Sequence, residues 1–146
     1  FIKKKVKVHN PIFWCMSKSK KNVLRGLHLQ LKNPQAKLIT VLHGKIYDVC
    51  VDCRKNSKTF GKYFSIYLSE KENKSLLIPA GFAHGFCTLT DDVILHYKCS
   101  KYRHSESETG ILWNDCDLNI AWPKKKLIIS EKEKNNFSFK DLKKLI

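Results

Sequence analysis

The chain is organised around one octapeptide, Val23-Leu24-Arg25-Gly26-Leu27-His28-Leu29-Gln30. Its mixture of apolar and β-branched residues predicts a strand, in which residues two apart point to the same face. Arg25 and His28 are three apart, so a regular strand places them on opposite faces. Gly26 lies between them and permits a bulge that turns both side chains into one cavity. The alternative is a glycine-kinked strand with an exposed Arg25 and a half-buried His28.

Outward from this octapeptide, short apolar or alternating runs are separated by turn signals. They predict strands over 37–42, 45–53, 62–68, 75–78, 86–89 and 93–99, with a further edge strand over 2–8. Gly44 and the pair Asp91-Asp92 predict hairpins between neighbouring runs. Only the C-terminus has a helical pattern, over 139–146, with Ser138 as its cap. Many short strands predict an all-β sandwich or barrel, and a jelly roll is the simplest choice.

The length of 146 residues predicts one domain over 1–146, with an atypical N-terminal segment over 1–22 and a C-terminal tail over 124–146. The formal net charge of +15 raises the question of nucleic-acid binding. However, only three of the basic residues are arginines, and the lysines are scattered. Arginine is the residue that reads phosphates and bases in a bidentate manner. We therefore expect a solvated lysine-rich surface and neither a nucleic-acid nor a membrane partner.

The six cysteines predict neither disulfides nor zinc. Cys50 and Cys53 form the only C-x-x-C pair, but they lie in an alternating run, where an i, i+3 pair faces opposite ways. A zinc site requires convergent thiolates and two further ligands. We expect reduced, mostly buried thiols in a cytoplasmic protein.

A second motif spans Pro79 to Phe86 and resembles the P-x-G-x-x-H turn of cupin-type jelly rolls. Many cupins bind a metal through a His-x-His pair followed by Glu. Here Gln30 stands two residues after His28, and no Glu follows before Leu42. Two imidazoles are too few for a stable first-row metal site. The histidines are therefore expected to be free for acid–base chemistry, without metal.

Seven ordered motifs carry a wider resemblance: 23–28, 34–38, 51–54, 78–86, 97–100, 113–115 and 130–133. In sequence and spacing they are similar to those of the dTDP-4-dehydrorhamnose 3,5-epimerase family. The resemblance implies a cupin-type double-stranded β-helix, usually a homodimer, that uses no metal or organic cofactor. It also implies a nucleotide-linked 4-keto-6-deoxyhexose substrate whose C3 and C5 centres are inverted, in the synthesis of deoxysugars for surface polysaccharide.

The resemblance also assigns roles. It implies that His28 is the base, Tyr97 the acid on the opposite face, Lys37 the cation beside the enolate oxygen, and Glu133 the carboxylate that holds His28. Asp115 is the second choice for that carboxylate and otherwise a turn residue. The substrate-binding residues implied are Arg25, Gln30, His84, Glu108 and Lys132, with Arg25 near the diphosphate.

Four departures from the family pattern bear on activity. The family carries a further N-terminal segment that helps to bind the nucleotide. A polar Gln-x-Asn-His-type stretch is replaced by Phe13-Trp14-Cys15-Met16, a frequent aromatic by Arg103, and an Asp by Glu133. The alternatives are therefore an inactive or binding-only relative, a 3- or 5-only epimerase, a ketoisomerase on a similar substrate and, last, a basic nucleic-acid-binding module.

Overall fold

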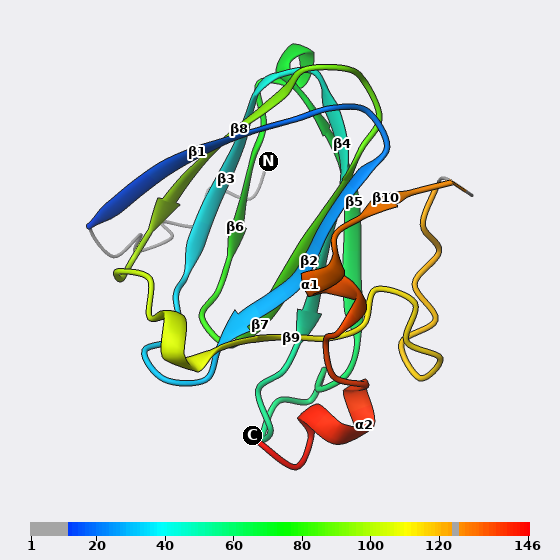
Figure 1. Ribbon diagram of the computed structural model, residues 1–146. Coiled ribbons are helices and arrows are strands. Elements are labelled where there is room, and N and C mark those ends of the chain that lie inside the picture. Colours follow the sequence, from blue (N-terminus) through cyan, green and yellow to red (C-terminus); the bar gives the residue numbers. More distant parts are fainter. Residues whose placement is uncertain (1–11, 124–125) are drawn as a thin grey trace.

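Two β-sheets face each other in the computed structural model, which describes residues 12–123 and 126–146 (Figure 1). The first sheet has the order β1 (Phe13–Ser19), β8 (Val93–Cys99), β3 (Lys37–His43) and β6 (Ser75–Ile78). The second has the order β10 (Ile128–Ile129), β2 (Val23–Gln30), β7 (Phe82–Thr88), β4 (Lys45–Asp52) and β5 (Tyr63–Ser69), and β9 (Glu108–Gly110) also pairs with β2. This arrangement confirms the predicted all-β jelly roll. The predicted strand over 2–8 lies outside the described residues.

Both predicted hairpins are wrong. β3 and β4 flank Gly44, yet β3 belongs to the first sheet and β4 to the second. β7 and β8 likewise lie in different sheets. In a jelly roll, successive strands cross from one sheet to the other, so a short connection marks a corner and not a hairpin. The long connection between β4 and β5 joins two strands that do pair.

The predicted bulge in the octapeptide is confirmed. Arg25 pairs with Phe86 and His28 pairs with His84, so two residues of β2 stand opposite the single residue Gly85 of β7. Residues two apart on β7 share a face, and their partners on β2 therefore share it too. The extra residue turns both Arg25 and His28 toward the space between the sheets.

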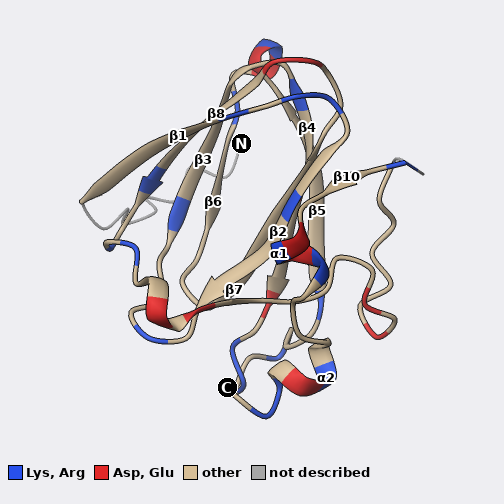
Figure 2. Ribbon diagram, viewed as in Figure 1, with Lys and Arg blue, Asp and Glu red and all other residues tan. Residues whose placement is uncertain are grey.

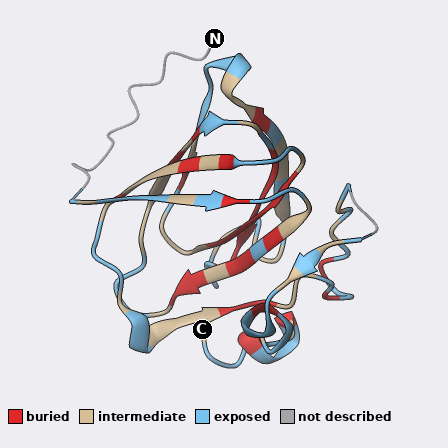
Figure 3. Cartoon of the chain, turned by 45° about the horizontal axis from the view of Figure 1, so that its top comes forward, coloured by how far each residue is buried: buried red, intermediate tan, exposed pale blue. Residues whose placement is uncertain are grey.

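The second sheet is buried on both of its faces. Its inward residues, with those of the first sheet, form one core cluster: Ile39, Val41, Ile46, Cys50, Leu68, Ile78, Phe86, Val93 and Leu95. Its outward residues form another with the C-terminal part of the chain: Leu27, Leu29, Tyr47, Val49, Val51, Cys53, Ala83, Ile111, Leu118, Phe139 and Leu142. Buried segments therefore run along its strands in Figure 3. Cys50 and Cys53 lie in different clusters, as alternation predicted.

The helices are short. They are α1 (Glu131–Lys134), α2 (Phe139–Leu142) and two 3₁₀ turns, Glu70–Glu72 and Ser105–Ser107. Ser138 caps α2 by accepting a hydrogen bond from the Asp141 amide at 3.1 Å, which confirms the predicted start of the helix. The helix ends four residues earlier than predicted. α1 was not predicted; its cap is Ser130.

In the part of the chain that the structure describes, lysine and arginine residues are spread over strands and loops (Figure 2). Four of the six cysteines are buried, which confirms the expectation of mostly buried thiols: Cys50, Cys53, Cys87 and Cys99. No helix in the described part of the chain has the length and apolar character needed to cross a bilayer.

Candidate active site

A cavity of about 410 Å³ opens between the two sheets on the side of β2 and β8. Its walls include most of the predicted site residues, together with Ser17, Phe86, Arg103 and Ser130: Arg25, His28, Lys37, His84, Tyr97, Glu108, Lys132 and Glu133. A smaller cavity of about 180 Å³ adjoins it and shares His28, Lys37 and Tyr97 as lining residues. Gln30 is the one predicted site residue that does not line the larger cavity; it lines the smaller one.

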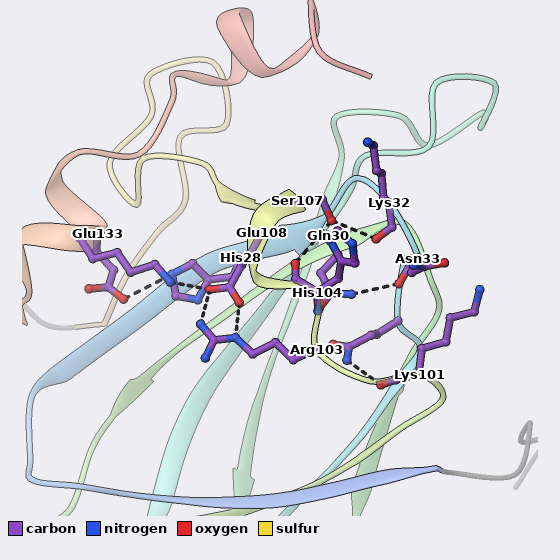
Figure 4. A network of polar contacts seen from close by, with 12 residues as sticks. His28, Gln30, Lys32, Asn33, Lys101, Arg103, His104, Ser107, Glu108 and Glu133 are labelled. Atoms are coloured by element: carbon purple, nitrogen blue, oxygen red, sulfur yellow. Dashed lines mark hydrogen bonds and ion pairs between the residues drawn. The ribbon is translucent and has the colours of Figure 1, made fainter.

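His28 lies on β2 with Glu133 of α1 beside it (Figure 4). The distance from His28 Nε2 to Glu133 Oε1 is 3.4 Å, and the Glu133 side chain is only 7% exposed. This distance is short enough for an ion pair, but the two groups do not have the geometry of a hydrogen bond. Burial lowers the pKa of His28 to about 4, and the positive charge of Lys132 adds to this effect. The imidazole is therefore neutral at neutral pH and able to accept a proton.

The structure places Asp115 away from His28. One oxygen of Asp115 accepts hydrogen bonds from the Asp117 and Leu118 amides, and the other accepts one from the Phe139 amide at 2.8 Å. Asp115 is thus a turn residue that also anchors α2. Of the two carboxylates considered as partners for His28, Glu133 is the one in contact.

Tyr97 and Lys37 reach the cavity from the sheet opposite His28. Tyr97 lies on β8 and Lys37 at the start of β3. The Tyr97 hydroxyl is 3.2 Å from Ser17 Oγ, and burial raises the pKa of Tyr97 to about 12. Burial also lowers the pKa of Lys37. A molecule between the sheets would therefore have an imidazole on one side and a protonated phenol on the other.

His84 has a buried partner that sequence reasoning did not identify. Its Nε2 lies 2.9 Å from Asp48 Oδ2, with 5% of the His84 side chain and none of the Asp48 side chain exposed. Asp48 stands between the inward residues Ile46 and Cys50 of β4. A lone acid on the apolar face of an alternating strand was the signal for it, because buried carboxylates are rare without a partner.

The Glu108 carboxylate forms ion pairs with two cationic side chains. Arg103 donates from Nε to Glu108 Oε2 at 2.6 Å and from Nη2 to Oε1 at 3.2 Å (Figure 4). Lys132 donates to the same Oε1. Burial alone would raise the pKa of Glu108, but these hydrogen bonds outweigh it and lower the pKa to about 2. Glu108 is therefore a carboxylate at any working pH.

The side-chain amide of Gln30 forms hydrogen bonds with backbone groups. Its Oε1 accepts a hydrogen bond from the His104 amide at 2.9 Å, and its Nε2 donates to the Asn33 carbonyl at 3.0 Å. These bonds join two loops at one end of the cavities. Gln30 thus supports the wall of the smaller cavity, where Phe13 and Cys15 also lie.

Within the described residues, no group of three or more His, Cys, Asp and Glu side chains is arranged to hold a metal ion. The histidines of the cavity are instead paired one to one with carboxylates, His28 with Glu133 and His84 with Asp48. That the site acts without metal or organic cofactor stays a prediction.

Comparison with known proteins gives a consistent result. The family model described as dTDP-4-dehydrorhamnose 3,5-epimerase matches residues 4–141. A dTDP-4-dehydrorhamnose 3,5-epimerase of Methanothermobacter thermautotrophicus is 48% identical over 122 residues, which cover 82% of this chain and 66% of the relative. The chain therefore spans about two thirds of the length of this relative.

Two solved structures extend the similarity to the fold. The dTDP-4-dehydrorhamnose 3,5-epimerase of Elizabethkingia anophelis superposes with a TM-score of 0.87 at 43% identity, covering 90% of this chain and 73% of that one. A dTDP-6-deoxy-D-glucose-3,5-epimerase of Legionella pneumophila, in complex with dTDP-4-keto-L-rhamnose, also gives 0.87, at 39% identity, covering 90% of this chain and 70% of that one.

Proposed function

Since the chain belongs to the dTDP-4-dehydrorhamnose 3,5-epimerase family, we propose that it epimerises a nucleotide-linked 4-keto-6-deoxyhexose at C3, at C5 or at both. The observation that carries the proposal is the placement of His28 and Tyr97, which line one cavity from opposite sheets. Inversion of a carbon centre requires a proton to leave one face and to return to the other. A base and an acid on opposite walls meet that requirement.

In the proposed reaction, the neutral imidazole of His28 removes a proton from the carbon next to the C4 carbonyl. The electron pair of the C–H bond forms the enolate, and the negative charge moves to the carbonyl oxygen. The Lys37 ammonium, on the cavity wall beside Tyr97, would stabilise that oxygen. Tyr97 then delivers a proton to the opposite face of the carbon, and both residues return to their starting states by exchange with solvent.

Glu133 and Asp48 have supporting roles in this proposal. The Glu133 carboxylate, 3.4 Å from Nε2 of His28, would stabilise the imidazolium as it forms and leave Nδ1 for the substrate proton. Asp48 would fix the ring of His84 in the same manner. Arg25 and Lys132 add positive charge to a cavity that is proposed to receive a diphosphate.

The proposal is tested by incorporation of solvent deuterium. The protein is incubated in D₂O with dTDP-4-keto-6-deoxyglucose, and the sugar is analysed by mass spectrometry. Two deuterons, absent with His28→Ala, are expected for a 3,5-epimerase, and one deuteron identifies a single-centre epimerase. A Tyr97→Phe variant should still exchange the first proton but give little inverted product, because only the returning proton is lost.

One observation favours the alternative of an inactive or binding-only relative. Phe13 and Cys15 line the smaller cavity at the stretch where the family pattern is polar. If calorimetry detects binding of dTDP without any deuterium exchange, the alternative is supported and the epimerase proposal fails. Absence of both binding and exchange would contradict both functions.

We also propose a homodimer and a cytoplasmic location. Within residues 12–123 and 126–146, β1 is the edge strand of the first sheet, and it exposes two large apolar side chains, Trp14 at 65% and Met16 at 68%. An exposed apolar edge strand favours pairing with a second copy. Sedimentation equilibrium should give a dimer that Trp14→Lys with Met16→Lys converts to monomer. A wild-type monomer at micromolar concentration would contradict this part of the proposal.

A further inference from the structure

An ion network joins three separate parts of the cavity wall. Arg103 lies in the loop after β8, Glu108 on β9 and Lys132 on α1, and both cations contact the same carboxylate (Figure 4). The Glu108 side chain is 15% exposed, whereas those of Arg103 and Lys132 are 61% and 55% exposed. The partly buried carboxylate thus lies between two more exposed cations.

The network leads to His28 through α1. Lys132, which contacts Glu108, is followed directly by Glu133, which contacts His28. α1 is only four residues long, and among the ion pairs of the described residues these two join its side chains to the strands beneath it. A helix of one turn has little stability of its own. The pairing of β10 with β2 holds the chain just before α1, and the Lys132 contact adds a restraint within α1 itself, next to Glu133.

We propose that Arg103 is a positioning residue for the catalytic pair: by fixing Glu108, it anchors Lys132 and so keeps Glu133 of α1 against His28. This inference rests on the proposed function, because it takes His28 as the base. Arg103 grips Glu108 with two parallel N–H donors, which define the orientation of the carboxylate as a single lysine contact cannot. Glu108 then presents Oε1 to Lys132 in a fixed place.

The competing interpretation is that Arg103 touches the substrate. Its side chain lines both cavities, and its Nη1 group makes no hydrogen bond within the described residues. The two roles differ in kinetics. Loss of a substrate contact made equally in the ground state raises KM, whereas displacement of Glu133 from the base lowers kcat.

The test compares Arg103→Ala and Arg103→Lys with the wild type, and uses Lys101→Ala as the matched control. Lys101 is an exposed cation of the same loop that lines neither cavity. For Arg103→Ala we expect kcat to fall about ten- to hundredfold with little change in KM, since small displacements of catalytic groups cost this much. Arg103→Lys should recover part of the loss, and Lys101→Ala should behave as the wild type.

Two further measurements separate positioning from general damage. In Arg103→Ala, amide hydrogen exchange should accelerate over residues 130–135 and remain unchanged in β4 and β7. The acid limb of kcat/KM should move to higher pH, because Glu108, whose negative charge raises the pKa of His28, is then less neutralised. The other charged or titratable groups that face His28 are kept in every variant: Arg25, Lys37, His84, Tyr97, Glu108, Lys132 and Glu133.

A rise in KM with kcat intact would overturn the inference in favour of substrate contact. Unchanged exchange over 130–135 would overturn it as well. The exchange experiment needs no substrate, so it decides the role of Arg103 even if the wild-type protein incorporates no deuterium and the proposed function itself fails.

Discussion

Replacement of Gly26 by alanine tests the bulge on which the site depends. The backbone of Gly26 has φ +118°, and a Cβ atom there would lie 2.4 Å from Gly85 Cα and 2.6 Å from the His84 carbonyl oxygen. Both atoms belong to the backbone of β7, so no side-chain rotation relieves the contact. A non-glycine residue at such a φ costs about 1–3 kcal/mol, and forced overpacking adds about 1–3 kcal/mol. We therefore expect Gly26→Ala to lose about 4 kcal/mol of the free energy of unfolding.

Urea denaturation followed by tryptophan fluorescence measures this loss. With a urea dependence of about 2 kcal/mol per molar, the midpoint should fall by about 2 M. Because β2 must move away from β7, any folded Gly26→Ala protein should also lose deuterium exchange, since Arg25 and His28 no longer share one cavity.

Gly44→Ala is the matched control. Gly44 also has a positive φ, of +83°, but the atoms nearest a Cβ there are side-chain atoms, Thr90 Oγ1 at 2.5 Å and Val93 Cγ2 at 2.9 Å. Gly44→Ala should lower the free energy of unfolding by about 1–2 kcal/mol, mainly because alanine is strained in this backbone conformation. Equal losses in the two variants, or a Gly26→Ala protein as stable as the wild type, would refute the reasoning from the close approach of β2 and β7.

Further predictions concern the titration of His28, the pair of His84 with Asp48, and the turn at Asp115. First, kcat/KM should stay level above about pH 5, because the pKa of His28 is about 4, until Lys37, whose pKa burial lowers, loses its proton; Tyr97, with a pKa of about 12, stays protonated over this range. An acid limb near pH 6.5 would contradict this. Below the ordinary pKa of 6.5, His28 is protonated in the unfolded chain but stays neutral in the folded chain. The free energy of unfolding should therefore fall by about 3 kcal/mol as the pH drops to about 4. His28→Asn should remove that dependence in urea titrations at the two pH values. Second, Asp48→Asn should lower kcat about tenfold or more, since the ring of His84 loses its buried carboxylate at 2.9 Å; an unchanged kcat in steady-state assays would argue against a role for the pair. Third, Asp115→Ala should cost about 2–3 kcal/mol in thermal unfolding, because three backbone amides lose their acceptor. The folded variant should keep its activity at low temperature. Loss of activity without loss of stability would instead indicate that Asp115 has a role in the active site.

Much of the fold could be predicted from the sequence. Apolar or alternating runs bounded by turn residues located β3, β4, β5, β6 and β8 to within a residue or two, because strand-forming residues and turn residues are local signals. The start of β7 was missed by four residues, since Gly85 and the preceding turn weaken the pattern. Ser138 was recognised as a helix cap because capping is a local hydrogen bond between a side chain and the third amide after it.

For the site as well, some features could be predicted from the sequence and others could not. Ordered motifs identified His28, Lys37, Tyr97, His84, Glu108, Lys132 and Glu133, all of which line one cavity. The sequence did not show that Asp48 pairs with His84, that Arg103 grips Glu108, or that Gln30 has its amide committed to two loops. Each of these contacts joins strands or loops that are distant in the chain.

Sequence by itself therefore located most of the strands, though not β1, β9 or β10, and it showed that Gly26 permits a bulge and singled out the residues proposed to carry the chemistry. Only the tertiary structure decided which strands pair, and it replaced the two expected hairpins with crossings between sheets. It also decided that Glu133, and not Asp115, meets His28. The physical reason is range: propensity, alternation and capping act over a few residues, whereas sheet pairing and buried ion pairs depend on where the remote partner is packed.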